Sequence, residues 1–229
     1  MLEWGRGVLF LLLTVALYYL SKALYRRFPL LPLTPLLLTP ALLVAVVLLS
    51  HVSYADYMVE SHWLLWLLGP ATVAFAVPVY LHRQLIRRHW LSLTLGVATS
   101  VLVAVSSTVW LARWLHLSDL LQRSLAMRSI TTPFAVEATR AVAGQVDLTA
   151  LFVVLTGVIG MAIGEGLLTC MMIRSRLGRG AAMGASAHGA GTARAYQMGP
   201  TEGVISSLVM LIAGVMTVLL APWLGRLFW

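Results

Sequence analysis

The sequence has little cysteine, little lysine and little charge of either sign. Cys170 is the single cysteine, Lys22 is the single lysine, and charged residues make up only 10% of the 229 positions. One cysteine excludes an internal disulfide, and the chain has neither a cysteine pair nor a His-Glu-x-x-His motif that would hold a metal. We therefore expect no metal and no cofactor. So little charge also argues against a soluble domain, which would consist of shorter, amphipathic segments.

Apolar residues take the place of the missing charge and make up 60% of the sequence. They lie in windows that approach the ~20 residues needed to cross a bilayer. These windows are 6–24, 30–50, 62–82, 90–112, 148–173 and 202–224, and the less apolar segments are 118–145 and 178–197. The pattern predicts an all-α polytopic membrane protein with about eight membrane segments, forming one transmembrane domain over residues 1–229.

The tryptophans support this division of the chain, because each lies near a predicted segment end, where aromatic belts form. They are Trp4, Trp63, Trp66, Trp90, Trp110, Trp114, Trp223 and Trp229.

The net charge of +8 does not indicate nucleic-acid binding, because the basic residues are not gathered on one face. They fall in short loops between apolar windows, as is typical of cytoplasmic loops. The clusters at 22–27 and 83–88 place two loops inside. If 118–145 enters the membrane and returns on the same side, the cluster at 174–179 and Arg226 also lie inside.

This parity predicts an inverted repeat of two three-helix units. The first unit comprises 30–50, 62–82 and 90–112, and the second comprises 148–173, 178–197 and 202–224. The middle member of each is interrupted, by Gly69, Pro70 and Pro78 in the first and by a Gly/Ala-rich stretch in the second. Paired interruptions of this kind indicate a binding site near the membrane midplane in secondary transporters. A competing similarity, FAVP at 75–78 and FAVE at 134–137, implies a different repeat.

The Gly/Ala-rich stretch, residues 178–195, reads GRGAAMGASAHGAGTARA and contains no Leu, Ile, Val or Phe. It has almost no apolar surface to offer lipid. Within a bilayer its backbone must therefore be buried in protein or line a wet cavity.

Four ordered motifs carry a family resemblance that covers nearly the whole chain. They read LLGPATVAFAVPVY at 67–80, SITTPFAV at 129–136, LTALFVVLTGVIG at 148–160 and GASAHGAGTARA at 184–195. The chain resembles the LrgB/CidB family of antiholin-like membrane proteins, to which the plastid glycolate/glycerate translocator is related. The resemblance implies small 2-hydroxy or 2-oxo monocarboxylates as substrates, crossed broken helices, and a small LrgA-like membrane partner. The family usually has Pro-Lys where this chain has Met127-Arg128.

A monocarboxylate site needs positive potential and hydrogen-bond donors, which broken helices and arginines supply. The candidate substrate-binding residues are Thr72, Arg128, Thr131, Thr132, Ser186, His188, Thr192 and Arg194. Pro70 and Pro133 break the helical hydrogen-bond pattern beside three of these threonines. Alternatively, the threonines satisfy backbone groups freed by proline, and the two arginines extend to the membrane face.

Glu137 and His188 are the candidate proton or cation sites, because ionisable groups are costly within a membrane. Glu137 equally fits a structural pair with Arg140 or Arg128, and His188 equally fits a hydrogen bond to a neighbouring helix. Ser186 lies two residues from His188, but proximity in sequence does not make a catalytic triad. We expect no enzymatic activity.

The sequence thus predicts a secondary transporter of small monocarboxylates such as glycolate, glycerate, lactate or pyruvate. We expect a multi-pass protein of the bacterial inner membrane that forms homo-oligomers. The alternative is a holin/antiholin-like regulator of murein hydrolase export and cell lysis.

Overall fold

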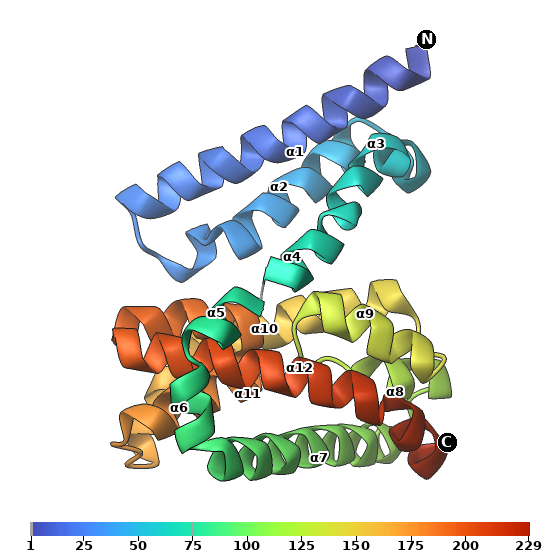
Figure 1. The fold of residues 1–229 in the computed structure, drawn as a ribbon. Helices are drawn as coiled ribbons and strands as arrows, with labels where there is room; N and C mark the ends of the chain where they lie inside the picture. The colour runs from blue at the N-terminus through green and yellow to red at the C-terminus, as the bar shows by residue number, and fades with distance from the viewer. Residues whose placement is uncertain (1, 75) are drawn as a thin grey trace. The chain divides into compact units, whose positions relative to one another are not determined.

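The computed structural model describes residues 2–74 and 76–229, without the side chains of residues 2–7, 31, 60, 65, 68, 71, 72, 76 and 78. The chain divides into two compact units, Met1–Val73 and Ala74–Trp229. Within the described residues every regular element is helical (Figure 1).

The first unit contains α1 (Leu2–Arg27), a short 3-10 helix η1 (Leu31–Leu33), α2 (Pro35–Leu49), α3 (Tyr54–Trp66) and most of α4 (Leu68–Ala74). Helix α1 packs on α3, where the rings of Phe10 and Tyr57 lie 6.0 Å apart. Thr14 and Tyr57 share a hydrogen bond of 3.2 Å between their hydroxyl groups. Helix α2 begins at Pro35, because proline at the first helical position loses no hydrogen bond.

The second unit contains α5 (Ala76–Leu81), α6 (Arg83–Arg88), α7 (Trp90–Trp114), α8 (Asp119–Ala126), α9 (Thr132–Ala141), α10 (Val146–Cys170), α11 (Arg176–Met198) and α12 (Pro200–Phe228). Helices α7, α10 and α12 are long and apolar enough to cross a membrane, as is Val8–Arg27 of α1. Among the described residues these four are the candidate spans, so the predicted count of about eight segments is not confirmed. Helix α2 has 15 residues, and the window 62–82 is divided among α3, α4 and α5.

Helices α8 and α9 run in opposite directions on either side of residues 127–131; we call this segment hairpin 1 and residues 127–131 its tip. Near the base, Nη1 of Arg123 donates to the Val142 carbonyl at 2.8 Å. The Gln145 amide donates to Oγ of Ser124 at 2.9 Å. Segment 118–145 is therefore irregular, as its sequence suggested, and neither of its helices is long enough to cross a bilayer.

Helix α11 also reverses its direction, at His188, where the backbone leaves helical geometry with φ 38° and ψ −120°. Arg179 and Arg194 both contact Glu165, although a straight helix would place them ~22 Å apart. Gly191 likewise lies against the Met183 carbonyl, eight residues earlier. We call the arms 176–187 and 189–198 hairpin 2. The predicted crossing at 178–197 is thus wrong, and the three-helix inverted repeat built on it is not confirmed.

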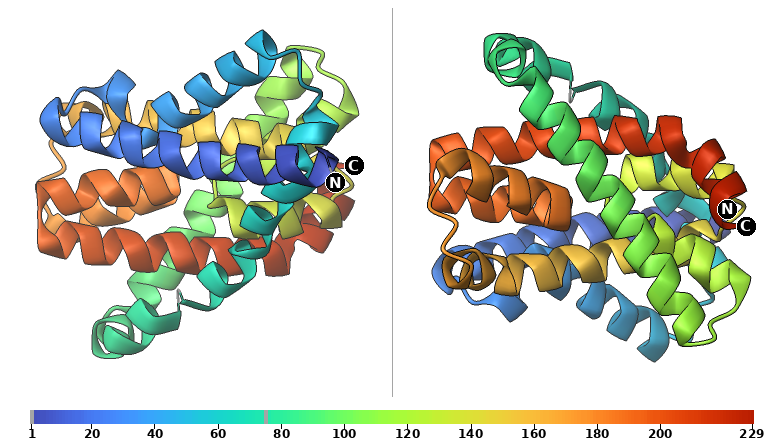
Figure 2. Two further views of the ribbon diagram at one scale, coloured as in Figure 1. Left: turned by 90° about the horizontal axis from the view of Figure 1, so that it is seen from above. Right: turned by 90° about the horizontal axis from the view of Figure 1, so that it is seen from below.

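Helix α12 shows that the two hairpins approach from opposite ends (Figures 1 and 2). Hairpin 2 contacts the first part of α12, from Glu202 beside Gly180 to Met210 beside Thr192. Hairpin 1 contacts the last part, from Gly225 beside Val142 back to Gly214 beside Phe134. The innermost of these contacts, at Met210 and Gly214, are ~6 Å apart along the helix axis.

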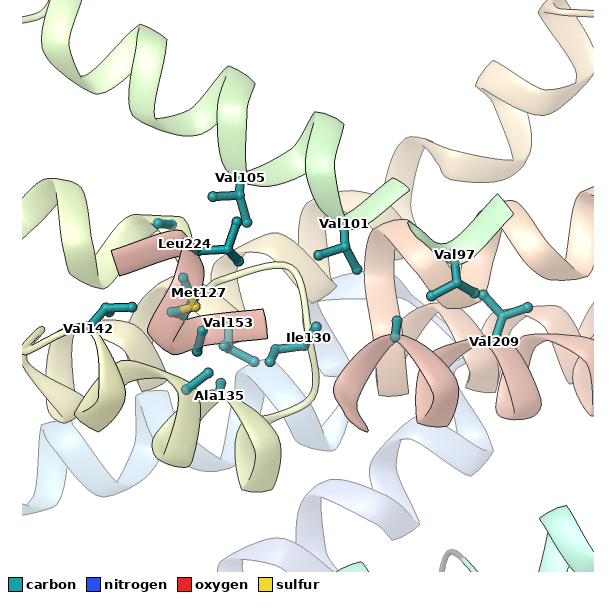
Figure 3. Packing of buried hydrophobic residues seen from close by; sticks show 14 of the residues in the cluster. Val97, Val101, Val105, Met127, Ile130, Ala135, Val142, Val153, Val209 and Leu224 are labelled. Carbon is teal, nitrogen blue, oxygen red and sulfur yellow. The ribbon is translucent and has the colours of Figure 1, made fainter. Parts of the chain in front are cut away.

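The core of the second unit lies between α7, hairpin 1 and α12. Buried residues recur every fourth position on α7 at Val97, Val101 and Val105, which places them on one helix face. Figure 3 shows Val101 and Val105 on the side of α7 that faces the tip residues Met127 and Ile130, whereas Val97 lies beside Val209 of α12. The tip of hairpin 1 is therefore held by apolar packing rather than exposed as a loop.

Candidate functional site

The tips of the two hairpins meet beside the middle of α10. Arg128, from the tip of hairpin 1, donates from Nη1 to Oγ1 of Thr156 at 3.1 Å. A Cβ at the next residue, Gly157, would lie 2.8 Å from Cε1 of His188 at the tip of hairpin 2. Adjacent residues of one helix thus contact both tips, which positions the candidate site.

Arg128 is the charged group of this site. Its Nη2 donates to Oγ1 of Thr108 on α7 at 3.2 Å, so two hydroxyls from two helices fix the guanidinium. In the described part of the chain, no carboxylate lies within ion-pair distance of it. A half-buried charge without a counter-ion is costly, and an anion would compensate it.

The guanidinium lines a groove of about 320 Å³, together with Thr156 of α10 and Ser186 of hairpin 2. The rest of the lining is apolar, including Leu125, Phe152 and Ile159. A small organic anion fits this combination of a fixed cation, hydroxyl groups and apolar walls.

Two helix N-termini lie at the tips, because α9 begins at Thr132 and the second arm of hairpin 2 begins after His188. Each contributes the positive end of a helix dipole. Pro133 stands in the first turn of α9, where its missing N–H is not needed. Thr131 occupies the capping position, but its side chain makes no capping hydrogen bond.

His188 is buried, with only 5% of its surface exposed. Its φ of 38° lies in the region that favours glycine, and such strain is often retained at functional sites. Among the described residues its Nε2 has no hydrogen-bond partner. The imidazole ring also contacts the backbone of Val153.

Other predicted residues are engaged elsewhere. Thr192 is buried and shares a hydrogen bond of 2.9 Å with Ser206 of α12, so it fastens hairpin 2. Arg194 lies near the base of hairpin 2, where it pairs with Glu165 at 2.7 Å and donates to Gln197. Ser186 donates to the Ala182 carbonyl while lining the groove.

Glu137 pairs with Arg140 at 2.8 Å, and both side chains are exposed. The pair corresponds to the structural alternative predicted for this carboxylate.

The predicted interruption in the first half of the chain is divided between the two units. Gly69 and Pro70 are exposed and lie in the first turn of α4, and Pro78 lies within α5. The side chains of Thr72 and Pro78 fall outside the described residues. Within the second unit, the Gly/Ala-rich stretch packs on α10 and α12, and its Ser186 lines the same groove as Arg128 at the tip of hairpin 1.

Sequence reasoning missed Thr108 and Thr156, the partners of Arg128. Each is a hydroxyl residue within a long apolar helix. A hydroxyl residue in a long apolar helix indicates a polar contact inside the protein, but it does not identify the arginine that these threonines contact.

Comparison with known proteins agrees with the family resemblance of the sequence motifs. The model of the LrgB-like family matches residues 14–227. The protein YwbG of Bacillus subtilis (strain 168) is 40% identical over 218 residues, covering 95% of this chain and 97% of YwbG. The antiholin-like protein LrgB of the same organism is 30% identical over 189 residues, covering 82% of each chain. The holin-like protein CidB of Staphylococcus aureus (strain Mu50 / ATCC 700699) is 30% identical over 227 residues, covering 99% of each chain. No solved structure matches the chain.

Proposed function

Since the chain belongs to the LrgB-like family of membrane proteins, we propose that it is a secondary transporter of small monocarboxylates of the glycolate, glycerate, lactate or pyruvate type. The observation that carries the proposal is Arg128, a fixed and uncompensated cation in a groove between two hairpin tips. In the proposed complex the substrate carboxylate pairs with this guanidinium, in the bidentate geometry that arginine favours.

The arrangement of the second unit supports alternating access. Each hairpin follows one long helix, hairpin 1 after α7 and hairpin 2 after α10, and the two enter from opposite ends of α12. We propose that α7 with hairpin 1 and α10 with hairpin 2 form the inverted repeat. Such repeats place substrate sites at broken helices near the bilayer midplane.

The arginines support an orientation in the bacterial inner membrane. The end of the second unit where α7 begins and α10 ends carries arginines with few acidic neighbours, namely Arg83, Arg87, Arg88, Arg174, Arg176 and Arg179. At the other end the arginines are nearly matched by acids, namely Arg113, Arg123, Arg140 and Arg226 with Asp119, Glu137 and Asp147. The positive-inside bias makes the first end cytoplasmic in the proposed topology. Arg226 then lies outside, whereas the distribution of arginines along the sequence had placed it inside.

Uptake into proteoliposomes that contain the purified protein tests the proposal. We expect saturable uptake of pyruvate, glycolate or lactate, and loss of that uptake in Arg128→Gln. Arg140→Gln is the matched control, because Arg140 is exposed and its ion-pair partner among the described residues is Glu137. Absence of saturable uptake of every one of these acids, with and without an LrgA-like partner, would contradict the proposal.

A second candidate function is favoured by the names of two relatives, antiholin-like LrgB and holin-like CidB. In that case the protein regulates murein hydrolase export and cell lysis, with a small membrane partner or as a homo-oligomer. Release of a trapped fluorescent dye from the same proteoliposomes distinguishes the two candidate functions. A protein that forms membrane lesions lets the dye escape from the vesicles, whereas a carrier retains it. Co-purification with an LrgA-like protein and a mass measurement in detergent test the partner and the oligomer.

A further inference from the structure

A second cavity adjoins the tip of hairpin 1 and shares no lining residue with the Arg128 groove. It is narrow, about 10 Å³, which is the room of one water molecule or one small ion. Its polar side chains come from three elements, Ser100 of α7, Ser129 of the tip and Thr217 of α12. Ala185 of hairpin 2 also lines it, so both hairpins contribute to its wall.

Two of these hydroxyl groups can only accept toward the cavity. Ser100 donates its proton to the Val97 carbonyl at 2.8 Å, and Thr217 donates its proton to the Ala213 carbonyl at 2.8 Å. Each oxygen therefore has lone pairs left and no proton to offer. Thr217 is almost completely buried, with 2% of its surface exposed.

The tip backbone adds further oxygen acceptors. In the described part of the chain, the carbonyl groups of residues 126–130 accept no hydrogen bond. Of these residues, Ala126, Met127, Ser129 and Ile130 line the cavity, and all but Ser129 are nearly fully buried. Buried carbonyl groups are rarely left without a partner, and a water molecule or a cation in the cavity would supply one.

We propose that this cavity binds one alkali cation of about the size of Na⁺, and that the cation is coupled to the carboxylate at Arg128. Hydroxyl and carbonyl oxygens are the ligands that hard cations prefer, and unwound carbonyls of broken helices hold Na⁺ in secondary transporters. The lining contains no carboxylate, which favours a monovalent ion over Ca²⁺ or Mg²⁺.

The coupling rests on the proposed function and follows from charge. Arg128 belongs to the same tip, but its guanidinium is held by Thr108 and Thr156, which do not line this cavity. While Arg128 is uncompensated it disfavours a cation nearby. A bound carboxylate neutralises it, so anion and cation favour each other's binding.

The thermal stability of the full-length protein in detergent tests ion binding without any transport. We expect the Tm to rise with NaCl, without substrate, relative to equal concentrations of choline chloride. Thr217→Val keeps the shape and removes the oxygen, and we expect it to weaken the apparent Na⁺ affinity about tenfold. Ser107→Ala is the control, because Ser107 also donates to a carbonyl of α7 but lies outside the cavity.

A Tm that is the same in sodium, potassium and choline salts would overturn the proposal and leave a bound water as the occupant. If Thr217→Val does not fold, Ser100→Ala makes the same test, and an unchanged Na⁺ response in it also overturns the proposal. In proteoliposomes, uptake that is indifferent to a Na⁺ gradient would contradict the coupling alone. Absence of uptake of any acid would contradict the proposed function but not the ion site.

Discussion

At the scale of single residues, the position of Arg128 depends on its two threonine partners. A guanidinium has five N–H donors, and Thr108 and Thr156 accept from two of them. The remaining donors are available for a ligand, and the threonines fix the plane from which they point. Arginine in this place therefore offers more than the point charge that a lysine would supply.

Thr156→Val should weaken substrate binding without removing the charge. The variant keeps the shape of the side chain but leaves one N–H of Arg128 without its acceptor. We expect a KM for uptake raised about three- to tenfold with a smaller change in the maximal rate, since one charged hydrogen bond is lost. Thr169→Val is the matched control, because Thr169 is exposed near the end of α10 and donates to the Glu165 carbonyl. An equal KM in both variants would argue against the role of Thr156.

At the scale of elements, hairpin 2 depends on glycines that allow close approach to its neighbours. Gly184 lies against the backbone carbonyl of Ser206 on α12, and a Cβ at Gly160 of α10 would lie 2.5 Å from Cβ of Ala187. Small residues at helix contacts permit such approach in membrane proteins. Hairpin 2 is therefore held against α10 and α12 by close backbone packing rather than by large apolar side chains.

Gly184→Ala should destabilise the protein markedly, because its new Cβ meets backbone that cannot rotate away. We expect a loss of about 1–3 kcal/mol, seen as a lower Tm in detergent. Gly166→Ala on α10 has open space around its Cβ and should be neutral or slightly stabilising, since alanine favours the helix. Equal Tm values for the two variants would refute the close packing of hairpin 2.

The base of hairpin 2 is held by Glu165, which pairs with Arg194 from one arm and Arg179 from the other. The three side chains are 27–41% exposed, so solvent screens the pairs. Glu165→Gln should therefore cost only about 1 kcal/mol, and less at high salt. A double-mutant cycle with Arg194→Gln checks this, and additive effects of the two changes would mean that the pair contributes nothing.

At the scale of the whole molecule, the single cysteine gives a test of topology. Cys170 is exposed at the end of α10, the end assigned to the cytoplasm. A membrane-impermeant maleimide should label it in inside-out vesicles and not in intact spheroplasts. Cys170→Ser combined with Ser118→Cys, at the start of hairpin 1, should show the opposite pattern. Labelling of both positions from one side would contradict two hairpins that enter from opposite faces.

The long spans of the second unit could be predicted from the sequence, because a continuous apolar run leaves little choice in lipid. Windows 90–112, 148–173 and 202–224 correspond to α7, α10 and α12. The irregular segment 118–145 was also recognised, since proline and charge interrupt an apolar pattern, and Arg128 stays a predicted site residue within it. The reversal at His188 was not, because two Gly/Ala-rich arms look like one helix until their contacts with α10 and α12 are known. The threonine partners of Arg128 likewise depend on tertiary contacts.

The dependence of both hairpins on α12 has a consequence for biogenesis. Hairpin 1 packs on Gly214 and Gly225 and hairpin 2 on residues 202–210, so a helix that is synthesised after both hairpins completes each of them. At a synthesis rate of ~5–20 residues per second, several seconds pass between the synthesis of hairpin 1 and that of α12. Until then the tip of hairpin 1 exposes backbone polar groups that lipid cannot satisfy. This favours retention of the nascent chain beside the insertion machinery until α12 emerges. Premature release of the nascent chain should therefore yield a protein with intact spans and no assembled site.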